Sequence, residues 1–352
     1  MKDKFRKNTN HLFTTLSLQP ESFVSARVKN YQLAVIRPSW KGNLLDSDNR
    51  FVDEEYPFLP KLSEVWKWKS KRNPQHDEKR SDPFRLNVIH DLSFLDDTLD
   101  CIIWLGHASF YIRLNGVTML IDPVFYNIPF VRRYVPHALS PKEIGRVDYL
   151  MISHDHRDHC QKQSIREVVQ NNPGVEILTG LQMDTQLKRW VSGTKMQCAG
   201  WYQQYRTLPS IAICFLPTRH WGKRTANDTN RRLWGAFMIS SDAHTVYFGG
   251  DTAYSRYFLE ASEMFPSIDV ALLGVGAYKP QWFMSRVHMG PEEAVRASNE
   301  LRAKAVVPMH YATFDLSDEP PGEAPKILLN QKENKLLNAD LKLLDPGQIL
   351  RL

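Results

Sequence analysis

Cysteine is scarce in this chain of 352 residues: it has four cysteines, Cys101, Cys160, Cys198 and Cys214, and no Cys-x-x-Cys pair. Such scattering argues against a disulfide framework and is typical of proteins in a reducing compartment. Long apolar runs are also missing, because no stretch approaches the roughly 18 uninterrupted apolar residues of a membrane-spanning helix. The basic start at residues 1–7 is not followed by the apolar run and cleavage site of a signal peptide. We therefore expect a cytoplasmic protein, with any membrane contact peripheral.

Charge of one sign is only slightly in excess. The formal net charge is +6 at pH 7, which suits anionic substrates or membrane surfaces without requiring nucleic acid. The sequence contains no helix-length basic stripe and no zinc-finger spacing, so nucleic acid is not a favoured partner. It contains no internal repeat either, and it leaves homodimerisation open.

The feature that stands out is the run His-Asp-His-Arg-Asp-His, which begins at His154. It places four metal-binding side chains within six residues. In an extended turn, His154 and His156 project from one side and can bind one cation, whereas Asp158 and His159 lie just beyond and can face a second. Imidazole nitrogen and carboxylate oxygen suit zinc, and also iron or manganese. The preceding apolar run, residues 147–153, predicts that this loop follows a strand.

Two cations would need about seven protein ligands, given roughly four positions around each ion. Three more strand-like runs, residues 211–217, 245–248 and 305–309, each lead into a candidate ligand: His220, Asp251 and His310. A single histidine after a strand is usually a structural, hydrogen-bonded residue. A series of strand ends that each deliver one ligand instead predicts a shared metal site held on loops.

The order His-x-His-x-Asp-His, His220, Gly-Asp251-Thr and His310 resembles the metallo-β-lactamase superfamily of hydrolases. Five segments, residues 220–225, 233–235, 274–284, 288–295 and 310–314, resemble the branch of N-acylphosphatidylethanolamine-hydrolysing phospholipases D and their bacterial relatives. The likeness covers roughly residues 100–345 and weakens before them. It implies an α/β fold of the αββα type, in which two mixed β-sheets are sandwiched between helices.

The resemblance also implies a role for each matching residue. One zinc ion would be bound by His154, His156 and His220, and the other by Asp158, His159 and His310. Asp251 would bridge the two, so the expected cofactor is two Zn²⁺ ions per chain. Asp122 would support the metal loop, and His288 would lie near the reacting phosphate. Arg157 stands where the branch often has a bulky aromatic and Ser298 where the mammalian enzyme has a histidine, which leaves the substrate open.

Two divalent cations about 3.5–4 Å apart lower the pKa of a shared water and so provide hydroxide near neutral pH. His288 could protonate the leaving oxygen, because imidazole titrates in the useful range, or it could only orient its neighbours. Asp122 precedes a proline and is expected in a turn. The same carboxylate can accept a hydrogen bond from a ligand histidine.

Other residues near these motifs are expected to serve different roles. His107, in a Gly-His-Ala segment, is expected to pack or to support the site rather than to bind metal. Lys223 and Arg224 could meet a phosphate or belong to a solvated loop, and the sequence leaves both open. Cys160 follows the metal motif where the chain turns away, so we expect it not to be a ligand.

The composition changes near residue 100. Residues 1–97 mix charged runs, prolines and aromatics and predict an N-terminal extension that wraps a catalytic domain at residues 98–352, with a loop at residues 73–83. Strands are predicted at residues 101–105, 109–114 and 117–121, with a hairpin turn at Asn115-Gly116. Helices are predicted at residues 163–170 and 291–301, the second because Pro291 precedes two glutamates.

Two segments combine aromatic and basic side chains. Residues 65–72 interleave Trp with Lys as proteins do at bilayer interfaces, or they form an amphipathic helix packed on the core. Residues 125–134 follow Asp122 and should overhang the metal site, or they form a buried connection.

Taken together, the residues and the resemblance predict a zinc-dependent phosphodiesterase of the phospholipase D type. It would hydrolyse N-acylphosphatidylethanolamine-like lipids to N-acylethanolamine and phosphatidic acid by means of a metal-activated hydroxide. One alternative keeps the fold and the metals but changes the substrate to a lactone, a cyclic phosphodiester or a nucleic acid. The other is a metal-binding scaffold without turnover.

Overall fold

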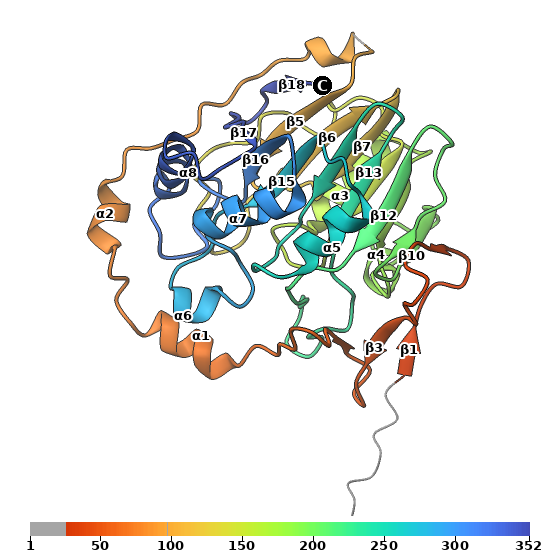
Figure 1. The fold of residues 1–352 in the computed structure, drawn as a ribbon, viewed down its shortest axis with the longest axis horizontal. Coiled ribbons are helices and arrows are strands. Elements are labelled where there is room, and N and C mark those ends of the chain that lie inside the picture. Colours follow the sequence, from red (N-terminus) through yellow and green to blue (C-terminus); the bar gives the residue numbers. More distant parts are fainter. Residues whose placement is uncertain (1–25, 97) are drawn as a thin grey trace, which may run out of the picture.

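The computed structural model describes residues 26–96 and 98–352, and Figure 1 shows their arrangement. Two mixed β-sheets form its centre. The first sheet has the strand order β10-β9-β8-β7-β6-β5-β18. Its strands are β5 (Cys101–Gly106), β6 (Ser109–Leu114), β7 (Val117–Ile121), β8 (Tyr149–Ile152), β9 (Glu176–Gly180), β10 (Met196–Ala199) and β18 (Ile349–Arg351).

The second sheet has the order β17-β16-β15-β14-β13-β12-β11-β2. Its strands are β2 (Ala34–Val35), β11 (Gln203–Gln204), β12 (Ala212–Leu216), β13 (Ala236–Ser240), β14 (Thr245–Phe248), β15 (Val270–Gly274), β16 (Ala305–Met309) and β17 (Asp340–Leu341). A small antiparallel sheet near the start of the described chain consists of β1 (Ala26–Val28), β3 (Asn43–Leu45) and β4 (Phe51–Val52).

The helices lie around these sheets (Figure 1). They are α1 (Leu62–Lys69), α2 (His76–Ser81), α3 (Lys162–Asn171), α4 (Asp184–Leu187), α5 (Tyr257–Met264), α6 (Gln281–Met284), α7 (Pro291–Leu301) and α8 (Glu323–Glu333), with a short 3-10 turn η1 (Ser93–Leu95). In the described part of the chain, no helix combines the length and the apolar character needed to cross a bilayer.

Successive side chains of the strands alternate between two hydrophobic cores, one on each face of the first sheet. In β5, Ile102 and Trp104 join the large core that also contains residues of the second sheet, whereas Ile103 and Leu105 face a second core that contains residues of α3 and α4. Successive side chains of a strand point to opposite faces, so both faces of the first sheet are buried. Apolar residues of α7 and α8, among them Leu301, belong to the large core as well. The expected αββα arrangement is therefore confirmed.

Most of the predicted elements are confirmed to within two residues at each end. β6, β7, β14, β16 and α7 have the predicted bounds, and α3 extends the predicted helix by one residue at each end. The turn between β6 and β7 has Asn115 and Gly116 at φ 49° and 74°, the left-handed conformation that an Asn-Gly hairpin turn requires.

The predicted loop at residues 73–83 is wrong, because the structure contains helix α2 within it. None of its residues is buried, so the helix has no apolar stripe that a sequence pattern could reveal. Its position depends on partners more than 200 residues away. Lys79 forms an ion pair with Asp315, and Gln75 donates a hydrogen bond to Glu323.

Residues 26–96 run along the outside of the two-sheet core (Figure 1). Strand β2 pairs antiparallel with β11 and so extends the second sheet. Trp68 of α1 donates a hydrogen bond to Asp318 at 3.0 Å and packs on Phe283, with ring centroids 5.5 Å apart. The part of the expected extension formed by residues 1–25, including the basic start, lies outside the described residues.

Candidate metal centre

The sequence-predicted ligands meet at one edge of the molecule because of strand direction. β7 and β8 are parallel in the first sheet, and β14, β15 and β16 are parallel in the second. The carboxyl ends of parallel strands lie at the same edge, where sites of α/β proteins are usually built. Asp122 follows β7, His154 follows β8 by two residues, Asp251 follows β14 and His310 follows β16.

The candidate ligands form two clusters of four residues, and within each cluster the ligand atoms lie within 4.8 Å of one another. One cluster contains His154, His156, His220 and Asp251, and the other contains His107, Asp158, His159 and His310. All seven predicted ligands are therefore brought together. The division agrees with the two predicted sets, apart from the presence of His107.

Asp251 lies between the clusters. Its Oδ2 is 3.2 Å from Nε2 of His159 and 3.7 Å from Nε2 of His220, and its Oδ1 is 3.2 Å from Nε2 of His310. One carboxylate thus faces histidines of both sets, which is the position that a bridging ligand needs.

Several of these histidines are held by one ring nitrogen, which leaves the other for a cation. Nδ1 of His159 donates to Asp122 at 2.9 Å, and Nδ1 of His220 donates to the carbonyl oxygen of Val287 at 2.9 Å. Nδ1 of His154 bonds to the hydroxyl of Ser153 at 2.9 Å. Such partners fix the ring orientation and the tautomer of a metal-binding histidine.

Asp122 is hydrogen-bonded to the loop that carries the metal motif. The residue is fully buried, and its carboxylate accepts hydrogen bonds from the backbone N–H of Ser153 at 2.8 Å, from the Ser153 hydroxyl and from His159. Its φ of 42° is unusual for a non-glycine residue, and such backbone strain is commonly found at functional sites. Sequence reasoning did not single out Ser153, because a serine before a metal motif carries no distinctive signal.

The residues present fit a bound cation. Among the described residues, four buried atoms that face this centre make no hydrogen bond: Nε2 of His156, His159 and His310, and Oδ1 of Asp251. Those of His159 and His310 lie 3.2 Å from Asp251 as charge contacts only. Buried polar atoms are nearly always paired, and an unpaired one costs roughly 1–3 kcal/mol. A nitrogen and oxygen donor set of this kind suits Zn²⁺, and also Fe²⁺ or Mn²⁺.

The protonation states of the centre are strongly shifted. Burial lowers the pKa of His154 well below its usual value. Burial acts the same way on His159 and His310, but the carboxylates of Asp251 and Asp158 outweigh it and raise the pKa of His159 well above the usual value and that of His310 to about 9. Burial favours protonation of Asp251, but the imidazoles around it hold its pKa well below the usual value. The carboxylates are therefore ionised, as metal ligands must be.

His288 and His107 lie beside the ligands. Nδ1 of His288 is 3.9 Å from Oδ2 of Asp251, and burial lowers the pKa of its imidazole to about 4. At neutral pH it is uncharged and keeps one N–H to donate. His107 is buried, and its Nε2 donates to Asp158 at 3.1 Å, which agrees with the expected supporting role. Cys160 is fully buried and belongs to none of the candidate metal clusters of the described chain.

The sequence left open whether Arg224 meets a phosphate or lies in a solvated loop, and the structure shows the contacts of its side chain. Its Nη1 donates to the carbonyl oxygen of Cys160 at 2.6 Å, and its guanidinium lies over the ring of Trp190. The side chain therefore braces the metal loop from one side. The metal loop is also held by an ion pair between Asp155 and Nε of Arg232 at 2.7 Å. The side chains of Asp155 and Arg232 are 0% and 8% exposed. Sequence reasoning missed this pair, because its members are 77 residues apart.

A cleft of about 610 Å³ opens at the metal centre. This volume lies within the usual range of about 300–1,000 Å³ for small-molecule sites. Its lining has an apolar part, formed by Ile128, Pro129, Val131, Trp221, Met284 and Leu316, and a basic part, formed by Arg157, Lys223 and Arg224. An amphiphilic molecule with an anionic group matches such a lining.

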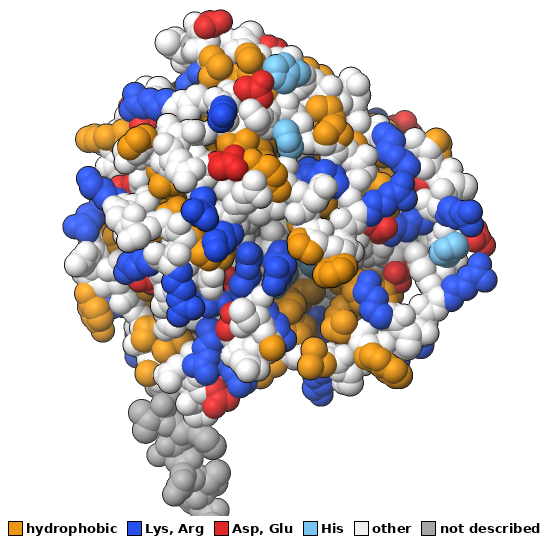
Figure 2. Space-filling view, turned by 180° about the vertical axis from the view of Figure 1, so that it is seen from behind, with side chains coloured by type: hydrophobic (Ala, Val, Ile, Leu, Met, Phe, Trp, Pro, Cys, Tyr) orange, Lys and Arg blue, Asp and Glu red, His pale blue; other side chains and the backbone are white. Residues whose placement is uncertain are grey.

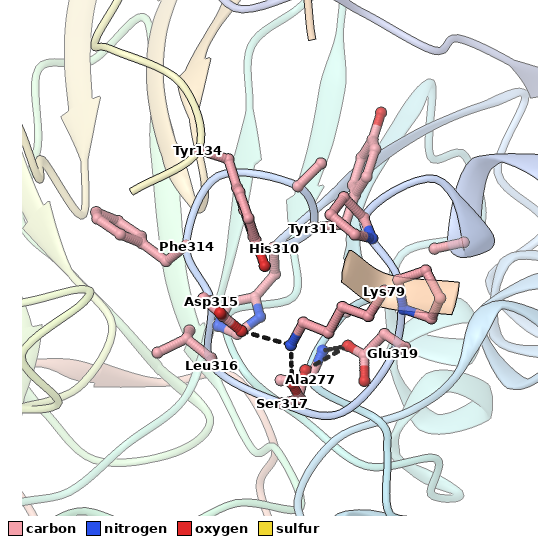
Figure 3. A pocket seen from close by; sticks show the side chains of 15 residues that line it. Lys79, Tyr134, Ala277, His310, Tyr311, Phe314, Asp315, Leu316, Ser317 and Glu319 are labelled. Atoms are coloured by element: carbon pink, nitrogen blue, oxygen red, sulfur yellow. Dashed lines mark hydrogen bonds and ion pairs between the residues drawn. The ribbon is translucent and has the colours of Figure 1, made fainter. Parts of the chain in front are cut away.

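A much smaller cavity lies behind His310 (Figure 3). Its volume of about 20 Å³ is comparable to one water molecule and excludes a lipid. In Figure 3, Lys79 of α2 reaches toward Asp315 and Ser317, and Glu319 accepts hydrogen bonds from the backbone N–H of Ala277. The contacts of this region hold the segment that follows His310.

The two segments that combine aromatic and basic side chains, residues 65–72 and 125–134, are each partly exposed and partly packed. In α1, no residue is buried and Trp66 is 76% exposed, although Trp68 packs on Phe283 of α6. In residues 125–134, Phe125 is buried, whereas Phe130 is fully exposed between the cleft-lining Pro129 and Val131.

Comparison with known proteins gives consistent matches. The family described as "Beta-lactamase superfamily domain" matches residues 118–311. The N-acyl-phosphatidylethanolamine-hydrolyzing phospholipase D 1 of Caenorhabditis elegans is 28% identical over 268 residues, which cover 70% of this chain and 74% of that protein. A metal-dependent hydrolase of Pyrobaculum aerophilum is 29% identical over 263 residues, which cover 71% and 99%. Among solved structures, a metallo hydrolase from Ignicoccus hospitalis has a TM-score of 0.57 at 22% identity and covers 72% of this chain and 99% of that one.

Proposed function

The chain belongs to the beta-lactamase superfamily and is a metal-dependent hydrolase, and from this premise we propose that it hydrolyses N-acylphosphatidylethanolamine-like phospholipids. The bond cleaved joins phosphorus to the oxygen of the N-acylethanolamine, and the other product is phosphatidic acid. The observation that carries the proposal is the cleft at the metal centre, whose lining is apolar in one part and basic in another. A phospholipid has the matching combination of acyl chains and phosphate. The likeness to the C. elegans phospholipase supports the same substrate class.

The proposed ligands are His154, His156 and His220 for one zinc ion and Asp158, His159 and His310 for the other, with Asp251 shared. When bound, such a pair supplies Lewis-acid charge and lowers the pKa of a water molecule. Other residues of the chain fix the orientation of the ligand histidines. Asp122 and Val287 hold the rings of His159 and His220 through their outer nitrogens.

His288 is the proposed contact to the phosphoryl group. It lines the cleft beside Asp251, and its side chain is 16% exposed, so a substrate can reach it. Because its imidazole is uncharged at neutral pH, it donates an N–H hydrogen bond to a phosphoryl oxygen rather than acting as a permanent cation. That bond strengthens as negative charge develops in the transition state.

The proposed partner surface is the bilayer that contains the lipid. Phe130 lies at the rim of the cleft and is fully exposed, and Trp66 of α1 is 76% exposed beside the basic residues Lys67 and Lys69. Aromatic rings at headgroup depth combined with lysines suit an anionic membrane surface. Figure 2 shows a face of the molecule on which Lys and Arg side chains gather next to apolar ones.

The test is turnover of N-acylphosphatidylethanolamine in mixed micelles by the zinc-loaded chain in ¹⁸O-labelled water. We expect unlabelled N-acylethanolamine and one ¹⁸O atom in phosphatidic acid, because water attacks phosphorus. Asp251→Asn should abolish both products. If the chain cleaves a chromogenic phosphodiester but no phospholipid, it is a phosphodiesterase for another substrate and the proposal fails.

Membrane contact is tested separately by sedimentation with vesicles that contain phosphatidylserine. Phe130→Ser and Trp66→Ser should each lower the bound fraction severalfold. Leu336→Ser, which changes an apolar residue that is 54% exposed after α8, is the matched control. Equal binding by all three variants would contradict a membrane role for Phe130 and Trp66.

A further inference from the structure

Two basic residues beside the metal centre have no counter-charge. Arg157 stands between the ligands His156 and Asp158, and Lys223 follows His220 by three residues, so both belong to ligand loops. Both line the same cleft, Arg157 exposed and Lys223 half-buried. Within residues 26–96 and 98–352, no ion pair or hydrogen bond of either side chain is present.

The other two basic residues around this wall of the cleft, Arg232 and Arg224, have partners within the protein. Arg232 pairs with Asp155 and Asp228. Arg224 donates its backbone N–H to Asp228 at 3.0 Å and lies against the carbonyl oxygen of Cys160. Arg232 is thus paired with two acids, whereas the guanidinium of Arg224 is held by a carbonyl oxygen and by the ring of Trp190.

The acids that line the cleft itself are Asp158 and Asp251, and both are proposed metal ligands. They are therefore not available to Arg157 or Lys223. A phosphodiester carries one negative charge, which metal ions held at this centre would meet. Unlike Arg224, which is held by Cys160 and Trp190, Arg157 and Lys223 would then be free to meet a second anionic group.

We propose that Arg157 and Lys223 form a second anion subsite, and that the preferred substrate is a phosphodiester with an additional carboxylate or phosphate near the scissile group. The inference rests on the proposed function and narrows its substrate class. Among N-acylated lipids, N-acylphosphatidylserine has this chemistry, because its leaving alcohol carries a carboxylate that ethanolamine lacks. The hydrolytic step is unchanged: water adds to phosphorus, the P–O bond to the alcohol breaks, and the alcohol leaves with a proton.

The first experiment measures binding by calorimetry, so it does not depend on turnover. Zinc-loaded protein is titrated with glycerol 3-phosphate, with 3-phosphoglycerate, which adds a carboxylate, and with glycerol 1,3-bisphosphate, which adds a phosphate. Because hydrogen bonds to charged groups are worth roughly a factor of ten or more, we expect at least one of the two probes that carry a second anionic group to bind about tenfold tighter than glycerol 3-phosphate. The probe whose affinity increases shows whether the second anionic group is a carboxylate or a phosphate.

The double variant Arg157→Gln/Lys223→Gln should reduce this preference to less than about threefold. Arg166→Gln on α3 is the matched control, since Arg166 is exposed and lines a different surface hollow. Equal affinity for all probes, or an unchanged preference in the double variant, would overturn the subsite.

The second experiment compares short-chain N-acylphosphatidylserine and N-acylphosphatidylethanolamine below their micellar concentrations, which removes membrane attraction. We expect a higher kcat/KM for the serine lipid than for the ethanolamine lipid. In the double variant this advantage should disappear because KM for the serine lipid rises. If neither lipid reacts while the binding preference persists, the proposed function fails and the subsite stands. If both lipids react equally and no probe is preferred, the subsite fails and the proposed function stands.

Discussion

Replacing Arg232 with methionine should destabilise the protein through the metal loop. Asp155 lies in that loop between two ligands, and its carboxylate is fully buried and paired with Arg232 at 2.7 Å. Removing one partner of a buried ion pair leaves an uncompensated charge and costs about 3–5 kcal/mol. With an unfolding entropy of about 2.1 cal/mol/K per residue, a chain of 352 residues has about 0.7 kcal/mol/K, so Tm should fall by about 4–7 °C.

The assay is thermal unfolding of zinc-loaded protein at pH 7, followed by metal analysis of the same samples. Asp155→Asn/Arg232→Met should lose less stability than Arg232→Met alone, because the fully buried charge of Asp155 is removed and only the partly exposed Asp228 loses its partner. Arg231→Met is the control, since the adjacent Arg231 side chain has no ion pair in the described part of the chain. A Tm for Arg232→Met within 1 °C of the wild type, or a double variant that loses the sum of the single effects, would refute the reasoning.

Three further substitutions test the parts of the centre. His288→Ala should keep the metal content and lower kcat about 10- to 100-fold, the equivalent of one hydrogen bond to a charged group; loss of metal would instead make it a ligand. Asp122→Asn should lower zinc affinity about 10- to 100-fold in a chelator competition, because it weakens the support of His159; unchanged affinity would contradict that support. Gly276→Ala should lower both Tm and metal content, since its Cβ would lie 1.9 Å from the carbonyl oxygen of His310. Gly174→Ala, where no atom lies within 4 Å of the new Cβ, should do neither, and equal effects of the two would rule out the proposed crowding.

The ligand positions could be predicted from the sequence because they depend on local order. Each candidate follows a short apolar run, and parallel strands deliver their carboxyl ends to one edge. Helix α7 was predictable with its bounds because Pro291 and two glutamates mark its first turn. These signals lie within a few residues of the feature that they specify.

The remainder depends on contacts between distant residues. Asp155 and Asp158 are the same residue type in the same motif, and only the fold shows that Asp155 faces Arg232 whereas Asp158 faces His107 and His310. Helix α2 buries none of its residues and is positioned by Asp315 and Glu323, so its sequence resembles a polar loop. The sequence also could not distinguish Arg224, which braces the metal loop, from Lys223, whose charge faces the cleft.

The central claim is that loops from several strands bind a pair of cations. Its most direct test is elemental analysis of the purified chain by mass spectrometry, with protein measured by amino-acid analysis. The account predicts close to two equivalents of zinc, iron or manganese per chain, and a clear loss in both His156→Ala and Asp251→Asn. A wild-type chain that holds no metal after incubation with zinc, or variants that retain two equivalents, would contradict it.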